Sequence, residues 1–231
     1  MSPRPTAVVT GASRGIGRAI ARRLAERYHV VAVARTQQAL EELAREIQGD
    51  GGRCTPLVAD VTDPEAVVEA LGSVEADVLV NNAGVGVMKP LVELTLADWR
   101  AMMSVNLDAV FHVTRVLLPG MIARRRGHIV NISSIAGRSA FPRGTGYTAT
   151  KHGLLGFSES LMLEVREHGV RVSVVMPGGV ATGFAGSTSG ADWKLQPDDV
   201  AESVSHLLAT PSRVLVYQLE IRAAQPPATR S

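Results

Sequence analysis

The chain has 231 residues, 45% of them hydrophobic, which is enough to bury the core of a single domain. A net charge of +2 without a basic block argues against a nucleic-acid partner, and one cysteine excludes a disulfide framework and a cysteine-based metal site. The start lacks an apolar signal region, and we find no apolar run approaching membrane length. We expect a cytoplasmic, single-domain protein over residues 1–231 with no membrane partner.

A glycine-rich turn follows the first predicted strand, residues 6–9, and precedes a predicted helix over residues 18–27. Such a turn lets the backbone approach a phosphate and aims helix N–H groups at it. We predict a dinucleotide phosphate site here, the alternative being a tight turn without a ligand. The glycine spacing is G-x-x-x-G-x-G, which differs from the common G-x-G-x-x-G. The candidate residues are Gly11, Ser13, Arg14, Gly15, Ile16 and Gly17.

The second predicted strand, residues 29–34, ends at Arg35, which lies 18 residues after Gly17. NAD-specific proteins place an acid at about this distance to bind the ribose hydroxyls. A carboxylate would repel a 2′-phosphate, whereas an arginine can bind it with two hydrogen bonds. Arg14 could supply a second cation. Both could instead be solvated surface arginines, but together they favour NADP(H).

Strands and helices alternate through the rest of the chain. We predict strands at residues 53–59, 77–80, 129–132, 170–176 and 214–221, and helices at 37–48, 95–124, 146–168 and from about 197. Another helix should begin with Asp63 as N-cap and Pro64 as its first residue. The helix over 95–124 should be kinked or interrupted near Pro119 and Gly120. This alternation predicts an α/β fold of the Rossmann type, with a doubly wound, mostly parallel, seven-stranded sheet and helices on both faces.

Two hydroxyls, Ser133 and Ser134, follow the fifth predicted strand. Tyr147 comes 13 residues after Ser134, and Lys151 follows at i+4. On a helix, Tyr147 and Lys151 share one face. An ammonium about 4 Å from the phenol would lower its pKa by about 3 units at an effective dielectric near 20, towards the range useful for acid–base catalysis. The alternative is a tyrosine–lysine pair on a solvated helix face.

The marked residues share a position, because each comes just after a predicted strand. In an open parallel sheet the carboxyl ends of the strands form one edge, and ligands bind there. The sequence therefore predicts one binding site at that edge. The residues concerned are those of the glycine-rich turn, Arg35, Asp60, Asn81, Ser134 and Pro177.

Several motifs occur together in a specific order over nearly the whole chain. They are Thr10-Gly11-x-x-x-Gly15-x-Gly17, Asn81-Asn82-Ala83-Gly84, Asn106, Ser134, Tyr147-x-x-x-Lys151 and Pro177-Gly178. This set resembles the short-chain dehydrogenase/reductase family, in its compact single-domain branch. The resemblance implies an enzyme that moves hydride between a nicotinamide cofactor and a carbonyl or alcohol.

The resemblance also implies a role for each site residue. Tyr147 would be the catalytic acid or base, and Lys151 would lower its pKa and hold the nicotinamide ribose. Ser134, favoured over Ser133 by its spacing to Tyr147, would hydrogen-bond the substrate oxygen, and Asn106 would support a water of the proton relay. The implied cofactor contacts are Asp60 and Val61 at the adenine, Asn82, Ala83 and Gly84 near the sheet, and Pro177, Gly178, Val180 and Thr182 at the nicotinamide.

The segment from about residue 182 to 194, here called the flap, is rich in glycine, serine and threonine, with Phe184 and Trp193 as its large apolar side chains. That composition provides little rigidity, and exposed aromatic groups favour a covering role. We predict a mobile flap over the nicotinamide and an apolar carbonyl substrate, with Val87, Met88 and Phe141 on the other wall. The alternative is a surface loop with Trp193 packed on the final helix. Three cations near this site, Lys89, Arg138 and Arg143, are either solvated or contacts for an acidic carrier.

The helices from residues 95 and 146 carry more apolar residues than one core-facing stripe needs. The resemblance implies that they form a subunit contact, which predicts a homodimer or homotetramer, the alternative being burial within one chain. The six histidines show no ligand spacing, so we expect no metal site.

Other functions fit the sequence less well. A catalytically silent NADP-binding regulatory protein remains the alternative, although it predicts the loss of a catalytic position and all four are present. A nucleotide-sugar epimerase would need a longer C-terminal part, and a P-loop NTPase would need Gly-Lys-Ser/Thr after the glycines. The substrate is left open, because the short segment after Pro177 and the tail after Ile221 match no family pattern.

Overall fold

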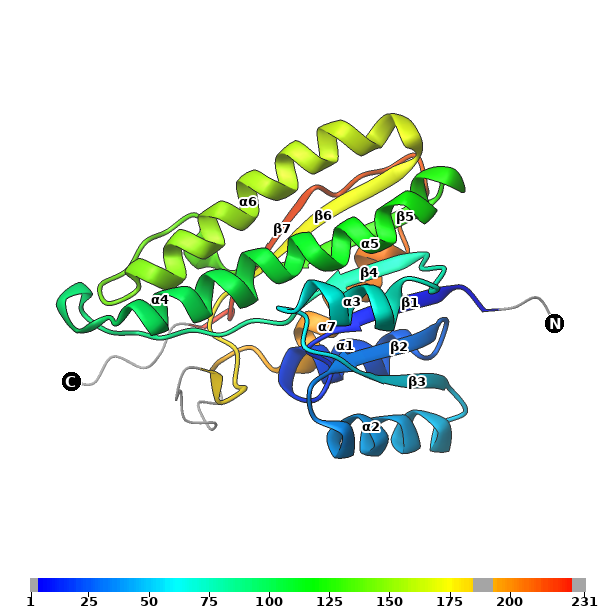
Figure 1. Ribbon diagram of the computed structural model, residues 1–231, viewed down its shortest axis with the longest axis horizontal. Helices are drawn as coiled ribbons and strands as arrows, with labels where there is room; N and C mark the ends of the chain where they lie inside the picture. The colour runs from blue at the N-terminus through cyan, green and yellow to red at the C-terminus, as the bar shows by residue number, and fades with distance from the viewer. Residues whose placement is uncertain (1–3, 185–192, 226–231) are drawn as a thin grey trace.

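Seven parallel strands form one sheet in a computed structural model that describes residues 4–184 and 193–225 (Figure 1). The order is β3-β2-β1-β4-β5-β6-β7, so the chain changes direction across the sheet between β1 and β4. This is the predicted doubly wound Rossmann-type fold, and every strand pair among these residues is parallel. The strands are β1 (Thr6–Thr10), β2 (His29–Ala34), β3 (Arg53–Val58), β4 (Val78–Asn81), β5 (Gly127–Ile132), β6 (Val170–Pro177) and β7 (Gln218–Ile221).

Helices cover both faces of the sheet because each inner strand is apolar on both sides. In β1, Ala7 and Val9 belong to one core and Val8 belongs to the other. Helices α1, α2 and α7 cover the first face of the sheet, and α3, α5 and α6 cover the second (Figure 1). The helices are α1 (Gly15–Leu24), α2 (Gln37–Gly49), α3 (Pro64–Leu71), α4 (Leu96–Met103), α5 (Ala109–Ala123), α6 (Thr145–Val165) and α7 (Pro197–Leu208).

Local signals place several helix starts correctly. The Asp63 carboxylate accepts hydrogen bonds from the backbone N–H groups of Glu65 and Ala66, and Pro64 begins α3, as the sequence predicts. The last strand starts later than predicted, at Gln218 instead of Val214. Just before it, a side chain provides a link to β6, because Ser173 Oγ donates to the carbonyl of Val216.

The interruption of the long helix lies elsewhere than predicted. Pro119 sits inside α5, which continues to Ala123, so the interruption predicted near Pro119 and Gly120 is wrong. Near the end of a helix, the missing N–H of a proline removes one hydrogen bond without ending the element. The break is instead a π-helical turn, Ser104–Asp108, and it carries the buried Asn106. Such turns often lie at functional sites.

By length and composition, the helical stretch Leu96–Ala123 could span a membrane, with a mean hydropathy of 1.2. The prediction that no apolar run approaches membrane length is therefore wrong for this stretch. Its apolar side chains have partners inside the fold, however: Met102 is fully buried beside α6, and Val113 and Leu117 belong to the core under the sheet. Packing within the chain therefore accounts for part of this apolarity, since 39% of the apolar window is buried.

Candidate active site

The glycine-rich turn is shaped by close packing at the carboxyl edge, meaning the edge where the strands end. Gly11 and Gly15 have φ of +66° and +55°, a region that favours glycine. A Cβ on Gly17 would lie 2.3 Å from the carbonyl oxygen of Gly11 and 2.4 Å from Asn82 Nδ2, so no larger residue fits. The glycine spacing thus follows from the close approach of α1 to the turn. It leaves the backbone of the turn open to a ligand.

Two side chains brace this turn against the end of β4. Asn82 Nδ2 donates to the carbonyls of Thr10 and Gly11, at 3.0 and 3.3 Å. Thr10 Oγ1 accepts from the backbone N–H groups of Asn82 and Ala83, at 3.0 and 3.2 Å. Sequence reasoning missed Thr10 as a site residue, although its place between a strand and the first glycine was a signal. Together these bonds join β1 and β4 at the point where the sheet order reverses, the usual ligand crevice.

Arg35 lies at the carboxyl end of β2 in a long, exposed ion pair with Asp60. Its side chain is 75% exposed, and the nearest acid, Asp60, is 3.7 Å away. A backbone hydrogen bond from Thr62 is the main reason why the pKa of Asp60 lies below its ordinary value. Helix α2 begins after Thr36 without a side-chain cap, so the Thr36 side chain leaves its first N–H groups unbound beside Arg35. Arg14 is also exposed, as the residue before α1.

The end of β6 and the segment that follows it, residues 177–182, reach back to the glycine-rich turn. Gly178 N–H donates to the carbonyl of Ile221 at 2.8 Å, and Val180 pairs with Leu195 in an isolated bridge. The Thr182 methyl would lie 3.4 Å from a Cβ on Gly15. These contacts place the predicted nicotinamide-side residues next to the predicted phosphate site. Val61, predicted at the adenine, is buried in the core, which leaves only its backbone for a ligand.

Ser134 and Tyr147 come together at the end of β5. Tyr147 is in the first turn of α6 and is 8% exposed; burial raises its pKa, and a hydrogen bond with Ser134 opposes that shift. Ser134 Oγ accepts from the N–H of Ala136 at 3.1 Å, which leaves its own proton to donate. Gly146 allows this arrangement, because a Cβ there would lie 2.3 Å from the Met102 methyl.

Lys151 is buried behind Tyr147, but its partner differs from the predicted one. Its ammonium donates to the carbonyl of Ile132 at 3.0 Å and lies 5.7 Å from the centre of the Tyr147 ring. Burial lowers the pKa of Lys151 to about 8. The predicted lowering of the Tyr147 pKa by this ammonium is absent here, because the β5 carbonyl holds the lysine and burial of the phenol dominates. A shared helix face was therefore insufficient to place the charge at the hydroxyl.

Asn106 is buried in the π-helical turn, and its amide is fully used. Its Oδ1 accepts from the N–H of Val85, and its Nδ2 donates to the carbonyl of Val85, both at 2.9 Å. Nδ2 also donates to Thr150 Oγ1 at 3.0 Å. The side chain thus holds the segment after β4 against α6. The proton-relay role of Asn106 stays a prediction.

An apolar group surrounds Tyr147. It contains Met102 and Ala136, with Val85, Val87, Met88 and Leu94 packed against them. The Phe184 ring lies 5.7 Å from the Tyr147 ring, and Gly86 makes room for it, since a Cβ there would be 2.7 Å from Phe184. Val87 and Met88 are therefore on the predicted wall, whereas Phe141 is exposed and packs on Gly144. Residues 185–192, most of the predicted flap, lie outside the described residues.

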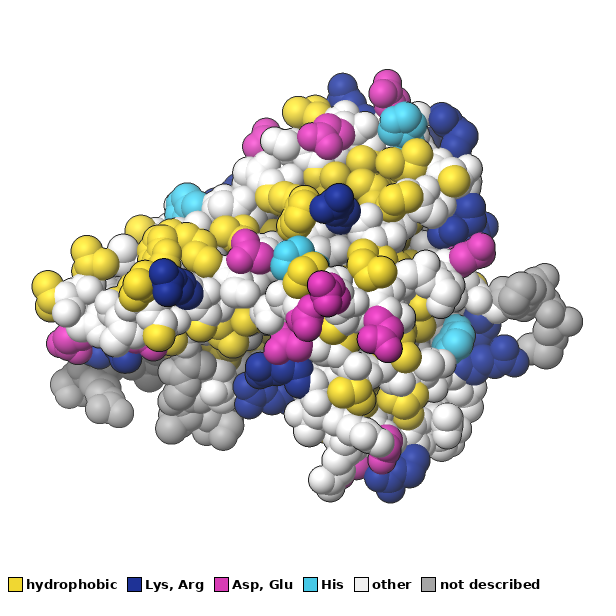
Figure 2. Space-filling model, viewed as in Figure 1, with side chains coloured by type: hydrophobic (Ala, Val, Ile, Leu, Met, Phe, Trp, Pro, Cys, Tyr) yellow, Lys and Arg dark blue, Asp and Glu magenta, His cyan; other side chains and the backbone are white. Residues whose placement is uncertain are grey.

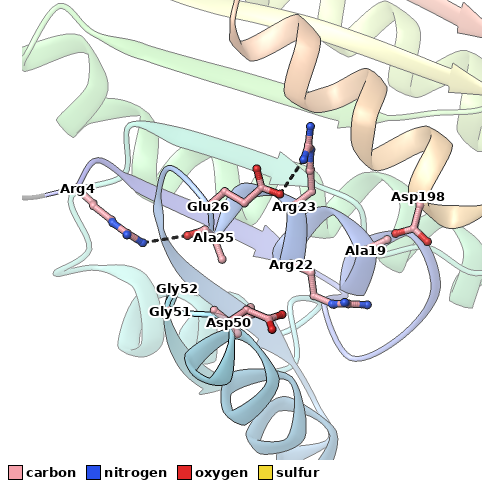
Figure 3. A pocket seen from close by; sticks show the side chains of 11 residues that line it. Arg4, Ala19, Arg22, Arg23, Ala25, Glu26, Asp50, Gly51, Gly52 and Asp198 are labelled. Atoms are coloured by element: carbon pink, nitrogen blue, oxygen red, sulfur yellow. Dashed lines mark hydrogen bonds and ion pairs between the residues drawn. The ribbon is translucent and has the colours of Figure 1, made fainter.

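A cavity of about 580 Å³ lies elsewhere, along the outer side of α1 (Figure 3). Acidic and basic side chains alternate around it, including an ion pair between Arg23 and Glu26 at 2.7 Å. None of the predicted site residues lines it. The position of the chemical groups, rather than the size of a hollow, therefore identifies the candidate site.

Comparison with known proteins gives extensive matches. The model of the short chain dehydrogenase family matches residues 5–192. The oxidoreductase UcpA of Escherichia coli is 36% identical over 222 residues, 94% of this chain and 84% of the relative. An alcohol dehydrogenase from Thermococcus sibiricus, solved with 5-hydroxy-NADP, is 34% identical with a TM-score of 0.88, covering 96% of this chain and 98% of that one. A serine dehydrogenase solved with NADP+ is 34% identical with a TM-score of 0.89, covering 98% of both chains.

Proposed function

The chain belongs to the short-chain dehydrogenase family, and we propose that it is an NADP(H)-preferring oxidoreductase acting on a carbonyl or alcohol substrate. The observation that carries the proposal is the meeting of the Ser134 and Tyr147 hydroxyls, with Lys151 buried behind them, at the same sheet edge as the glycine-rich turn. A proton donor, a hydrogen-bond donor and a cation thus converge beside an open backbone. This set suits proton transfer to a substrate oxygen.

The residues at the carboxyl edge fit a dinucleotide. The open glycine backbone at the start of α1 suits a pyrophosphate, and the exposed Arg35 beside the uncapped start of α2 suits a 2′-phosphate. Asp60 is 3.7 Å from Arg35, and a bound phosphate would compete with it for the guanidinium. The two solved relatives named above hold NADP-type cofactors, which supports the same preference here.

The proposed chemistry divides between cofactor and chain. When bound, the nicotinamide would exchange a hydride with the substrate carbon. Tyr147 gives a proton to the substrate oxygen in reduction and takes it back in oxidation, while Ser134 donates a hydrogen bond to that oxygen. Burial keeps the phenol of Tyr147 protonated in the free protein, which suits the reducing direction. Lys151 has three N–H donors, of which Ile132 takes one, so others remain for a ribose hydroxyl.

The substrate should have an apolar body. Val87, Met88 and Phe184 line the approach to Tyr147, and burying such side chains against an apolar group is favourable. Closure of the flap over the substrate stays a prediction, since its central residues fall outside the described part of the chain. The single-domain organisation of residues 1–231 and a cytoplasmic location also stay predictions.

A homodimer through α5 and α6 is part of the proposal. Hydrophobic side chains gather over these two helices on the face shown in Figure 2. Phe111 of α5 is 46% exposed and Leu163 of α6 is 53% exposed. Large apolar groups in such a position favour a protein contact. Sedimentation at micromolar concentration should give a species larger than one chain of 24.5 kDa, and a monomer alone would contradict this part.

The first test is oxidation of NADPH and of NADH with a panel of ketones, aldehydes, quinones and 3-oxoacyl thioesters. We expect turnover with NADPH and a preference over NADH of about 10- to 150-fold, as one lost charged hydrogen bond of about 1.5–3 kcal/mol implies. Arg35→Asp should reverse or abolish that preference. Arg45→Asp makes the same charge change on the outer side of α2 and serves as the control.

The results of this assay test the cofactor assignment and distinguish an enzyme from a silent regulatory protein. Equal use of NADH and NADPH by the unmodified protein would refute the assignment of Arg35. NADPH binding without turnover of any compound in the panel would favour the silent regulatory protein. That alternative gains no support from the site, because Asn106, Ser134, Tyr147 and Lys151 all remain in place.

A further inference from the structure

The hydroxyl of Thr150 occupies a buried junction beside the candidate active site. Thr150 is fully buried, and its Oγ1 donates to the carbonyl of Tyr147 at 2.8 Å. The same oxygen accepts a hydrogen bond from Asn106 Nδ2 at 3.0 Å. The direction of both bonds is determined, because Asn106 Oδ1 already accepts from the N–H of Val85 and its Nδ2 must be the donor.

Three separate segments are linked by this hydroxyl and the Asn106 amide. They are the segment after β4 through Val85, the π-helical turn through Asn106, and the first turn of α6 through Tyr147. Among the hydrogen bonds of the described residues, the one to Thr150 alone joins Asn106 to α6. The neighbouring contact between Gly146 and Met102 is apolar. It therefore limits how closely α6 approaches Met102, but it does not fix the orientation of α6 as a hydrogen bond does. The hydroxyl is the directional link between Asn106 and the helix that carries Tyr147.

We propose that Thr150 is a positioning residue for Tyr147, an inference that rests on the proposed function. Its two hydrogen bonds hold the first turn of α6 so that the Tyr147 hydroxyl meets Ser134 and faces the wall formed by Val87 and Met88. Without the hydroxyl, Asn106 keeps both bonds to Val85, but the first turn of α6 can shift. A misplacement of about 1 Å in a catalytic group can cost about 100-fold in rate.

The test compares Thr150→Ser with Thr150→Ala, because both lose the methyl group and only the first keeps the hydroxyl. We expect Thr150→Ser to stay within about 3-fold of the wild-type kcat and Thr150→Ala to fall about 10- to 100-fold, as for a shifted catalytic group. Thr150→Val, the isosteric change, should behave like Thr150→Ala. Binding of NADPH should change little in all three, since the hydroxyl touches none of the proposed cofactor residues except through the Tyr147 backbone.

The pH profile provides a readout that simple loss of stability would leave unchanged. A looser Tyr147 loses part of the Ser134 hydrogen bond that lowers its pKa. In the oxidation direction, the rise of kcat with pH should therefore move to higher pH in Thr150→Ala and stay in place in Thr150→Ser. Thr148→Val is the matched control on the same turn, because the Thr148 hydroxyl is buried without a hydrogen-bond partner among the described residues.

The kinetic results can contradict either the positioning role of Thr150 or the proposed function, and they distinguish the two. Equal kcat and equal pH profiles for Thr150→Ser and Thr150→Ala would refute the positioning role, as would an equal loss in both. Wild-type protein without turnover would contradict the proposed function instead. In that case titration of the phenolate absorbance, with Tyr147→Phe as the blank, still tests Thr150: an unchanged Tyr147 pKa in Thr150→Ala would refute the role.

Discussion

The two edges of the sheet use similar polar residues in opposite ways. At the amino edge, where the strands begin, the Asp77 carboxylate accepts two hydrogen bonds from Arg126, at 3.0 and 2.6 Å, and one from the N–H of Thr6 at 2.9 Å. At the carboxyl edge, Arg35 extends into solvent with its nearest acid 3.7 Å away. The Asp77 carboxylate thus has three donors from within the chain, whereas Arg35 has one longer ion pair that a ligand could replace.

A buried histidine and a buried lysine, His128 and Lys151, show the same difference between the two edges. At the amino edge, His128 Nε2 lies 2.8 Å from Ser173 Oγ, which gives its proton to the carbonyl of Val216, so Nε2 carries the imidazole proton. Burial lowers the pKa of His128 to about 3, so it is neutral. At the carboxyl edge, Lys151 keeps its charge at neutral pH, although burial lowers its pKa to about 8. A buried charge with one backbone partner costs stability, and such a cost indicates function.

The largest expected effect is the loss of turnover in Tyr147→Phe. Removing the proton donor should lower kcat about 10²- to 10⁴-fold, while the free energy of unfolding should change by less than about 1 kcal/mol. Tyr28→Phe, near the amino edge, should leave kcat unchanged. Steady-state kinetics and urea unfolding measure the two quantities. Wild-type turnover in Tyr147→Phe would remove the basis for treating the carboxyl edge as catalytic.

Lys151→Met should separate activity from stability. Below pH 8 the wild type holds a buried charge, and between pH 8 and 10.5 the unfolded state binds more protons, so the stability of the wild type rises with pH there. Relative to Lys151→Met, the wild type should gain about 3 kcal/mol over this range, while the variant lacks turnover. Urea unfolding at several pH values measures the difference. Parallel pH curves would show that the folded protein leaves the lysine pKa at its unfolded value, which would contradict its burial as a charge.

His128→Gln should instead change how the free energy of unfolding depends on pH below 6.5. The neutral imidazole contributes stability above pH 6.5, and this contribution is lost as pH falls towards 3, because the unfolded state then binds the extra proton. At pH 4.5 the wild type should have lost about 3 kcal/mol that the variant keeps. Turnover near neutral pH should be unaffected in a folded variant. A loss of turnover beyond the loss of folded protein would mean that the amino edge also serves the reaction.

The smallest expected effect is that of Asp77→Asn. The amide can still accept from the N–H of Thr6, and the lost ion pair involves an Arg126 side chain that is 70% exposed. The free energy of unfolding should therefore fall by about 1 kcal/mol, with kcat unchanged. Thermal unfolding and kinetics on the same preparation check both. A drop in kcat with unchanged stability would reverse the contrast between the edges.

Features coded by neighbouring residues were predictable from the sequence alone. The apolar strand runs, the Asp63 cap before Pro64 and the order of strands and helices depend on local periodicity and local hydrogen bonds. Parallel strands then bring every strand end to one edge, so the location of the candidate site follows from the same pattern. That is why the residues after β1, β2, β5 and β6 could be named before their distances were known.

Tertiary structure alone decided how those residues are held. The Thr10 hydroxyl accepts from Asn82, 72 positions away, and Thr150 accepts from Asn106, 44 positions away, so no local pattern marks either bond. Lys151 takes the carbonyl of Ile132 rather than the phenol one turn away, because burial in the fold selects its partner. The helix break falls at Asn106 instead of Pro119 for the same reason: the side chain that stabilises the break binds Val85, on a segment brought close only by folding.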